Sequence, residues 1–238
     1  MSIATNIAAI QERIAAAARR AGHPSADVAL MAVTKTHPPE RIREAYRAGL
    51  RLFGENRVQE FAGKASGVAE LASAQWHMIG HLQTNKASRT VELFHAVDSV
   101  DSVKLAEKLN SAAQAAGKKL PVLIEINVGG EAAKSGVAPD SRELEQLLTA
   151  APRLEALEFR GLMTVPPFTD DPERAWPFFR KLRELRDAIA LRLPRISMQE
   201  LSMGMSHDFE VAIEEGSTCV RVGTAIFGER ARANPRGH

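Results

Sequence analysis

The chain has 238 residues, of which 45% are hydrophobic and 25% charged, and its formal net charge at pH 7 is only +2. This composition is typical of a globular protein with a large apolar core, and the lack of a dense lysine and arginine block excludes the charge pattern of a nucleic-acid binder. A single cysteine, Cys219, excludes an internal disulfide and any multi-cysteine metal site, and no apolar stretch is long enough to span a bilayer, so we expect a cytoplasmic protein with no membrane partner.

The first predicted element is an amphipathic helix at the start of the chain. Its isoleucines recur at spacings of four and three residues, at Ile3, Ile7, Ile10 and Ile14. Ser2 is a suitable N-cap and Gly22 a suitable end, because serine accepts from free N–H groups and glycine adopts the left-handed conformation of a helix end. One face of this helix is therefore expected to be buried.

Strand-like and helix-like segments then alternate. The predicted strands cover residues 28–34, 51–53, 75–79, 94–98, 122–128, 159–165, 201–205 and 219–222. The predicted helices between them cover residues 38–48, 58–71, 84–92, 101–116, 140–150, 172–191 and 208–215, and a short helix ends the series.

This alternation predicts the fold class. Eight strand–helix units in a chain of this length predict an α/β protein with one closed (β/α)8 TIM-type barrel and an extra N-terminal helix. An open doubly wound sheet is the competing fold. No linker or low-complexity tract divides the sequence, so we expect one domain over residues 1–238.

Lys35 is the first candidate for chemistry, because it follows the apolar run that ends at Val33 and precedes the helix start at Pro38 and Pro39. Active sites of such barrels lie at the carboxyl ends of the strands. A lysine at that position suits a nucleophilic amine, whereas the commoner fate of a strand-end lysine is simple solvation.

The segments after the last two predicted strands form a candidate phosphate site. Ser202 to Ser206 contains two serines and a glycine, and Gly223 and Thr224 lead from the last strand into a helix. Small residues let backbone N–H groups approach an anion, and phosphates are often held by these two loops. Each motif alone would more often be an ordinary turn, but their joint placement favours Ser202, Ser206, Gly223 and Thr224 as phosphate ligands.

Arg221 alternates with Val220 and Val222, so its guanidinium is expected to point into the barrel, where it needs a partner. Glu125 is one candidate for an ion pair, and a ring nitrogen or oxygen of a ligand is the other. With Arg221 nearby, partial burial would also lower the pKa of the Lys35 amine. A phosphate cradle, a ring-facing arginine and a nucleophilic lysine together predict pyridoxal 5′-phosphate (PLP) held covalently on Lys35 as a Schiff base.

Two further polar residues fall at the same predicted end of the barrel. Asn56 and His81 are candidates for contacts with the cofactor ring or its 3-oxygen, and loop capping is the alternative role for both. No histidine or carboxylate grouping has the spacing of a metal site, so no metal is expected. His77, His95 and His207 receive no assignment.

These residues lie in seven ordered motifs that resemble the pyridoxal phosphate homeostasis protein family, of the YggS/PROSC type. The motifs cover residues 31–35, 53–57, 76–86, 127–136, 161–163, 201–206 and 220–228. The resemblance implies a fold-type III barrel like the alanine racemase N-terminal domain and a role in vitamin B6 homeostasis. Matched by position, Lys35 is the Schiff-base lysine and Arg221 the pyridine-nitrogen contact. Ser206, Gly223 and Thr224 match the phosphate site, and Asn56 and Ser202 also fall within motifs.

A PLP-dependent racemase-like enzyme of low activity is the alternative function. Racemisation needs a base on each face of the substrate, but the only tyrosine, Tyr46, is predicted on the helix after the first strand. Few residues follow Thr224, so no second domain is expected to supply that base. An arginine at the ring nitrogen also weakens the ring as an electron sink. We therefore expect a PLP carrier or regulator that is a monomer. Its prospective partners are amino acids and PLP-dependent apo-enzymes. A third interpretation is a barrel enzyme that acts on another phosphate ligand.

Overall fold

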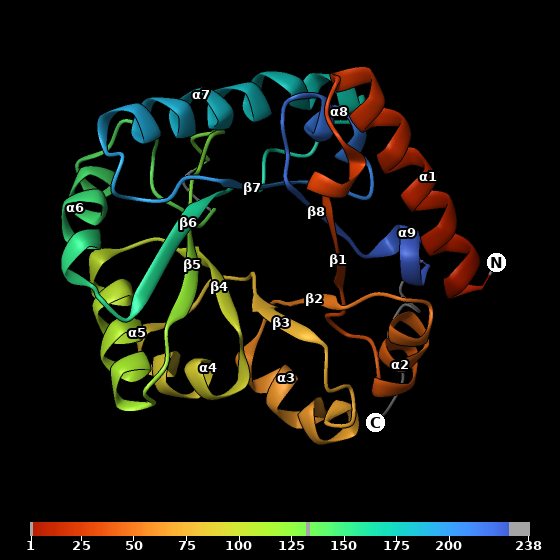
Figure 1. Ribbon diagram of the computed structural model, residues 1–238, viewed down its shortest axis with the longest axis horizontal. Helices are drawn as coiled ribbons and strands as arrows, with labels where there is room; N and C mark the ends of the chain where they lie inside the picture. Colours follow the sequence, from red (N-terminus) through yellow and green to blue (C-terminus); the bar gives the residue numbers. More distant parts are fainter. Residues whose placement is uncertain (1, 132–133, 229–238) are drawn as a thin grey trace, which may run out of the picture.

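The strands of this protein close into a barrel of eight parallel strands in sequence order (Figure 1). The computed structural model describes residues 2–131 and 134–228. The strands are β1 (Ala29–Val33), β2 (Leu52–Glu55), β3 (Gln75–Met78), β4 (Ala96–Val100), β5 (Leu120–Glu125), β6 (Leu157–Met163), β7 (Glu200–Met205) and β8 (Cys219–Val222). Backbone pairing of β8 with β1, from Ala29↔Cys219 to Ala32↔Val222, closes the ring. The closed barrel is confirmed, and the open doubly wound sheet is excluded.

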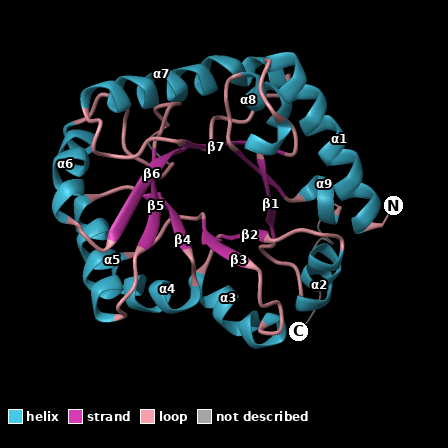
Figure 2. Cartoon of the chain, in the orientation of Figure 1, coloured by secondary structure: helices cyan, strands magenta, loops and turns pink. Residues whose placement is uncertain are grey.

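A ring of helices surrounds the strands (Figure 2). The helices are α1 (Ile3–Ala21), α2 (Pro39–Arg47), α3 (Val58–Lys64), α4 (Ala87–Leu93), α5 (Val103–Ala115), α6 (Arg142–Ala150), α7 (Trp176–Arg192), α8 (Phe209–Glu214) and α9 (Thr224–Phe227). Their apolar faces cover the outer face of the barrel, so the strands are buried on both sides, as the parallel arrangement requires. Within the described residues, no helix combines the length and the apolar character that crossing a membrane requires.

Helix α1 packs against α8, α9 and α2 on the outside of the barrel (Figure 1). It is capped as the sequence predicts: the Ser2 hydroxyl accepts from the Thr5 N–H, and Gly22 ends the helix at φ 76°. The four isoleucines of the predicted apolar face are all buried. Asn6 also donates to the Ile226 carbonyl at 2.9 Å, so α1 is fastened to the last described helix. The extra N-terminal helix thus covers the place where the barrel closes.

Most predicted element boundaries hold within a few residues. The helices expected over residues 84–92 and 172–191 each begin with a 3₁₀ turn, at Thr84–Lys86 and Pro172–Ala175, and two other elements differ for identifiable reasons. The fifth strand was expected at residues 122–128 but ends at Glu125, because Ile126 then bridges to Val137 of the following loop. The helix expected over residues 58–71 is α3 followed by a 3₁₀ turn over Ala65–Val68. Apolar periodicity continues through both segments, so it could not reveal either change of backbone geometry.

Gly161 of β6 permits a close approach to β7, which leads to a stability prediction. A Cβ atom at this residue would lie 1.8 Å from the Glu200 carbonyl oxygen. Gly161→Ala should therefore push the two strands apart and destabilise the protein by about 1–3 kcal/mol. Thermal unfolding checks this, because each kcal/mol lowers the Tm of a domain of this size by roughly 2–4 °C.

A matched control for this substitution is Gly63→Ala on α3, where a new Cβ atom meets nothing within 4 Å. Alanine is the better helix former there, so this variant should melt at or above the wild-type temperature. A Gly161→Ala protein that melts with the wild type would show that the strands separate at no cost.

Candidate functional site

Lys35 lies two residues beyond β1 and is partly buried, at the barrel end where all eight strands have their carboxyl termini. Thr34 before it is fully buried, and Thr36 after it has a φ of 65°. Because parallel strands bring their carboxyl ends together, the segments that follow β2, β3, β7 and β8 meet at this end as well. The expected placement of Lys35 at the carboxyl end of the first strand is what the structure has.

Arg221 is 3% exposed, and its side chain crosses two neighbouring strands inside the barrel. Nη1 donates to the Ser202 hydroxyl of β7 at 2.7 Å, and Nη2 donates to the Thr164 carbonyl just after β6 at 2.6 Å. Val220 and Val222 are buried on the opposite, helix-facing side. Burial lowers the pKa of Arg221, although neighbouring acidic groups oppose the shift, and an arginine remains protonated at neutral pH. The site therefore holds one fixed positive charge inside the barrel.

Glu125 was one of the two predicted partners of Arg221, but the two residues form no ion pair. Its Oε1 accepts from the Ser135 hydroxyl at 2.9 Å, while its Oε2 is buried without a hydrogen-bond partner among the described residues. Burial raises the pKa of this carboxyl, and Ser135 and the charge of Arg221 lower it by smaller amounts. Arg221 satisfies its donors with a hydroxyl and a backbone carbonyl instead, and sequence reasoning missed Thr164 because a carbonyl acceptor has no sequence signal.

A hydrogen bond links the loop after β7 to the first turn of α9: the Ser206 hydroxyl accepts from the Ala225 N–H at 3.3 Å. Gly204, near the end of β7, has a φ of 94°, and a Cβ atom there would meet Ala212 at 2.6 Å, so this position requires glycine. Gly223 is partly buried at the start of α9, and Thr224 is exposed. The structure therefore brings the predicted phosphate-site residues Ser206, Gly223 and Thr224 to one place, while Ser202 lies deeper, against Arg221.

Asn56 and His81 also lie at this barrel end, with different surroundings. The Asn56 Oδ1 is buried and has no hydrogen-bond partner within the described part of the chain. Gly80 packs directly on the Asn56 backbone, since a Cβ atom at residue 80 would lie 2.3 Å from the Asn56 main-chain carbonyl oxygen. The His81 ring is largely exposed, and its Nδ1 lies 3.1 Å from Asp101 Oδ2.

Three buried side-chain oxygens lack a hydrogen-bond partner among the described residues, and all belong to the carboxyl ends of β2 and β5: Glu55 Oε2, Asn56 Oδ1 and Glu125 Oε2. An unpaired buried oxygen costs free energy, so a native protein has a reason for each one. A ligand with hydrogen-bond donors provides such a reason for Asn56 Oδ1 and Glu125 Oε2. Together with a fixed arginine, a partly buried lysine and a hydroxyl-rich pair of loops, this end of the barrel fits a small anionic ligand that carries a carbonyl group.

Cys219, the only cysteine, is buried at the start of β8. Burial raises the pKa of its thiol to about 12. A thiol reacts as the thiolate, so Cys219 is chemically inert at neutral pH and is not a candidate nucleophile.

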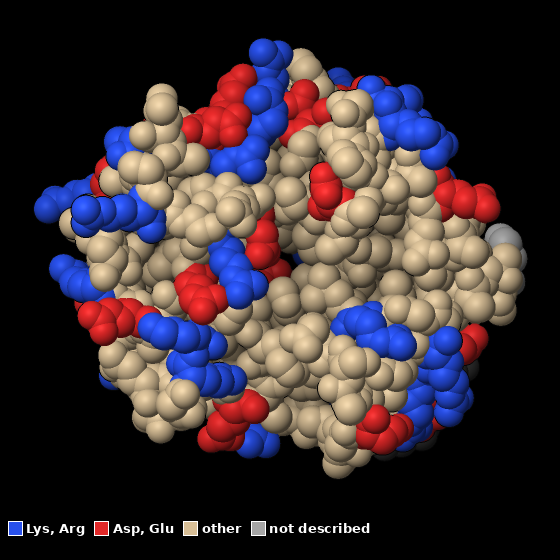
Figure 3. Space-filling model, viewed as in Figure 1, with Lys and Arg blue, Asp and Glu red and all other residues tan. Residues whose placement is uncertain are grey.

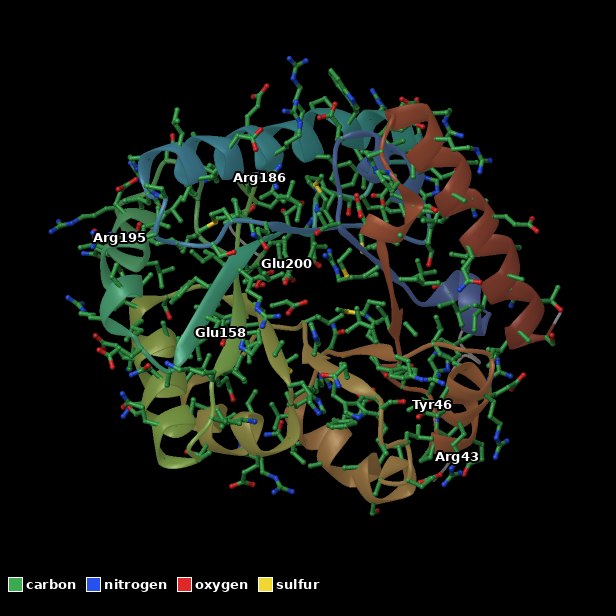
Figure 4. All side chains as sticks on the ribbon, in the orientation of Figure 1. Arg43, Tyr46, Glu158, Arg186, Arg195 and Glu200 are labelled. Atoms are coloured by element: carbon green, nitrogen blue, oxygen red, sulfur yellow. The ribbon has the colours of Figure 1, made fainter. Side chains whose placement is uncertain are left out.

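Charged residues also gather at the opposite end of the barrel, where the strands begin. Figure 3 shows acidic and basic side chains beside a hollow near the barrel axis, and Figure 4 places Glu158 and Glu200 there. Cavities of about 550 and 180 Å³ lie at this end, and Arg160 and Glu200 line both of them. No group of three or more histidine, cysteine or carboxylate side chains within the described residues could hold a metal ion.

The three histidines without a predicted role have structural partners. The His77 Nδ1 lies 3.0 Å from Asp98 Oδ1 beside the smaller cavity, His95 Nδ1 accepts from the Trp76 N–H, and His207 Nε2 contacts the Asp170 carbonyl. His77 and His95 lie at the strand-start end and His207 lies in the loop after β7. None of these contacts requires a ligand.

The His77–Asp98 pair gives a prediction for the pH dependence of stability. Burial opposes protonation of His77, but the Asp98 carboxylate outweighs it and raises the pKa of the imidazole. A raised native pKa stabilises the fold below the unfolded-state pKa of about 6.5, and this stabilisation is lost as the pH rises through the native value. His77→Gln should therefore lower the Tm more near pH 6 than near pH 9, as calorimetry at a series of pH values would measure.

The neighbours of His77 set the control for that experiment. Glu200 and Arg160 face the same cavity, and His95 has a pKa lowered by burial, so its own titration has the opposite sign. His95→Gln should accordingly cost least near pH 6. Equal losses of Tm at both pH values for His77→Gln would contradict the charged pair.

Comparison with known proteins gives consistent similarities over nearly the whole chain. The sequence model of the family described as "Alanine racemase, N-terminal domain" matches residues 5–231. Proteins named "Pyridoxal phosphate homeostasis protein" from Aquifex aeolicus and Pseudomonas aeruginosa are 46% and 44% identical, over 97% and 98% of this chain and 99% and 98% of theirs.

Solved structures show the same likeness. The structure of PipY from Synechococcus elongatus, a COG0325 family member with PLP bound, has a TM-score of 0.83 at 36% identity and covers 95% of this chain and 100% of that one. An alanine racemase from Clostridium difficile has a TM-score of 0.72 at 14% identity, with 98% of this chain and 58% of that chain covered. The second likeness shows the shared fold alone.

Proposed function

Because this chain belongs to the pyridoxal phosphate homeostasis protein family, built on the alanine racemase N-terminal fold, we propose that it holds PLP as a Schiff base on Lys35 and serves as a PLP carrier. The observation that carries the proposal is the related structure with PLP bound, which matches 95% of this chain at 36% identity. Lys35, two residues beyond β1, and the unpaired buried oxygens of Asn56 and Glu125 support the same site.

Each candidate residue has a distinct part in this proposal. PLP supplies an aldehyde, and Lys35 supplies the amine that bonds to it with release of water. Ser206, Gly223 and Thr224 provide hydroxyl and backbone donors for the phosphate, at the loops that commonly hold phosphate in this fold. Arg221, already held by Ser202, donates to the ring nitrogen, and Asn56 and His81 face the ring or its 3-oxygen.

The positive charge of Arg221 favours holding the cofactor over turning over a substrate. A guanidinium beside the ring nitrogen keeps that nitrogen unprotonated, which weakens electron withdrawal from a bound amino acid. Racemisation also needs a second base. The only tyrosine lies on α2 outside the barrel (Figure 4), where its hydroxyl contacts the Ser73 hydroxyl at 2.5 Å. A carrier that takes up and releases PLP, with PLP-dependent apo-enzymes as recipients, is therefore favoured.

A slow racemase-like activity is the second candidate function, because the barrel shares the alanine racemase fold. Incubation of the PLP-loaded protein with L-alanine, followed by chiral chromatography, separates the two. We expect no sustained formation of D-alanine above the rate of free PLP. Sustained racemisation that disappears in Lys35→Ala would make the protein an enzyme.

The experiment that tests the proposed function is an absorption spectrum before and after borohydride reduction, followed by peptide mass mapping. We expect visible absorption that borohydride removes and a pyridoxyl group on Lys35. Absence of the adduct after addition of PLP would favour the third interpretation, a barrel that binds a different phosphate ligand without an imine bond.

A further inference from the structure

The backbone around Lys35 is held by a buried set of ion pairs and hydrogen bonds that the proposed function leaves unexplained. Its centre is Lys64, the last residue of α3, which is only 9% exposed. The other members are Glu55 at the end of β2 and Glu60 one turn earlier on α3. We call these three residues the Lys64 network.

The Lys64 ammonium contacts the lysine-bearing segment on both sides of Lys35. Its Nζ donates to the Thr34 carbonyl at 3.0 Å and to the His37 carbonyl at 3.4 Å. The same nitrogen lies 2.7 Å from Glu55 Oε1 and 3.2 Å from Glu60 Oε1. An ammonium has three N–H groups, so its whole hydrogen-bonding capacity is used on this segment and on the two carboxylates.

The two carboxylates then bind the residues next to Lys35. Glu55 Oε1 accepts from the Thr34 hydroxyl, and Glu60 Oε1 accepts from the Thr36 N–H, each at 2.5 Å. Thr36 has a φ of 65°, a conformation that a β-branched residue rarely adopts without external support. The Glu60 contact supplies that support, so the residues immediately before and after Lys35 are both fixed.

The composition of the network argues against a purely stabilising role. Glu55 is fully buried, and burial raises the pKa of its carboxyl, an effect that Lys64 and Thr34 oppose. Its second oxygen has no hydrogen-bond partner among the described residues. A buried ion pair with an unsatisfied oxygen stabilises a fold poorly compared with apolar packing, so its position against the lysine-bearing segment needs another reason.

We propose that the Lys64 network positions Lys35: it fixes the direction in which the Lys35 side chain projects from the end of the barrel, and thereby sets the reactivity of its amine. The biological use of this positioning rests on the proposed function, but the effect on the reactivity of the Lys35 amine can be measured without PLP. Glu55, Glu60 and Lys64 act through the backbone of residues 34–37 and are not proposed to touch the cofactor.

The test compares Lys64→Met with Lys118→Met. Lys118 is a matched control because its ammonium also donates to two backbone carbonyls, those of Val91 and Phe94, at the strand-start end of the barrel. Each variant removes a lysine ammonium that is at least partly buried and bonded to backbone carbonyls, and calorimetry would record the loss of Tm in each. Reactivity at Lys35 should respond to the first variant only.

Two readouts separate positioning from folding. Competitive acylation of the protein without PLP, resolved by peptide mapping, gives the reactivity of Lys35 relative to the exposed Lys104. It should change about threefold or more in Lys64→Met and remain at the wild-type value in Lys118→Met. The rate at which the borohydride-reducible adduct with PLP forms should fall about tenfold in Lys64→Met, since small displacements of a reacting group reduce reaction rates by such factors. Binding of pyridoxine 5′-phosphate, which has the ring and phosphate but no aldehyde, should change little.

Each result decides the matter. Unchanged Lys35 acylation in a folded Lys64→Met protein would overturn the positioning role, whatever happens to the Tm. If the wild type forms no adduct with PLP, the proposed function fails, while the acylation comparison still decides whether the network controls Lys35. Should Lys64→Met not fold, Glu60→Gln keeps the buried Lys64–Glu55 pair and weakens the contacts of residue 60 with the Thr36 N–H and the Lys64 ammonium, and it should also change the acylation ratio.

Discussion

Purified Lys35→Ala protein should lack the visible absorption of a lysine-bound PLP and should carry no pyridoxyl group on the peptide that contains residue 35. The reason is chemical: alanine has no amine, and imine formation requires one. Residual PLP should bind only through its phosphate and ring, so it should leave the protein on gel filtration. Spectra of the wild type and the variant, each loaded with PLP and then desalted, give the measurement.

The control for this experiment is Lys86→Ala. Lys86 follows β3 and lies at the same end of the barrel, but it has no part in the proposed site. The control should remain yellow and give the Lys35 adduct in full yield. A Lys35→Ala protein with wild-type absorption that survives desalting would show that another amine holds the cofactor.

Arg221→Met should destabilise the protein by about 3–5 kcal/mol, because it removes two buried hydrogen bonds from a charged donor, each worth about 1.5–3 kcal/mol. The substitution leaves the Thr164 carbonyl and the Ser202 hydroxyl without their donor inside the barrel. With roughly 2–4 °C per kcal/mol for a domain of this size, the Tm should fall by about 10 °C. Denaturant unfolding and calorimetry, both without PLP, measure the loss directly.

Two further variants sharpen the interpretation of this loss. Arg221→Lys keeps the charge but can restore only part of the forked contact, so its stability should lie between the wild type and Arg221→Met. Arg19→Met on the exposed side of α1 removes an arginine from solvent and should change stability by less than about 0.5 kcal/mol. Equal stability of Arg221→Met and Arg19→Met would mean that the Arg221 contacts are not needed by the fold.

The barrel could be predicted from the sequence because each strand and helix is indicated by the residue pattern of its own segment. Each strand is a short apolar run, each helix has a 3.6-residue pattern, and the alternation of the two leaves few possible topologies. The position of Lys35 at a strand end follows directly from that pattern. The same logic placed Arg221 inside the barrel, since its neighbours Val220 and Val222 occupy the other face.

The partners of these residues could not be predicted, because they come from segments distant in the chain. Glu125 had the right charge for Arg221, yet Arg221 donates to Ser202 and to the Thr164 carbonyl. The contacts of Lys64 with Thr34 and Glu55 join three separate elements. A lysine near the end of a helix ordinarily indicates solvent exposure or a favourable dipole interaction. Nothing in the local pattern reveals that this one is buried against the segment carrying Lys35.

The buried thiol of Cys219 gives the protein a practical property. Its sulfur lies inside the barrel with a pKa of about 12, and the chain has no other cysteine. Towards maleimides and related reagents the native protein should therefore behave as if it had no cysteine at all. A single cysteine introduced at Phe168, whose side chain is 75% exposed, would be the one reactive thiol of an otherwise wild-type molecule. A fluorophore attached there could transfer energy to a bound chromophore, and the loading and release of the barrel could be followed continuously in solution.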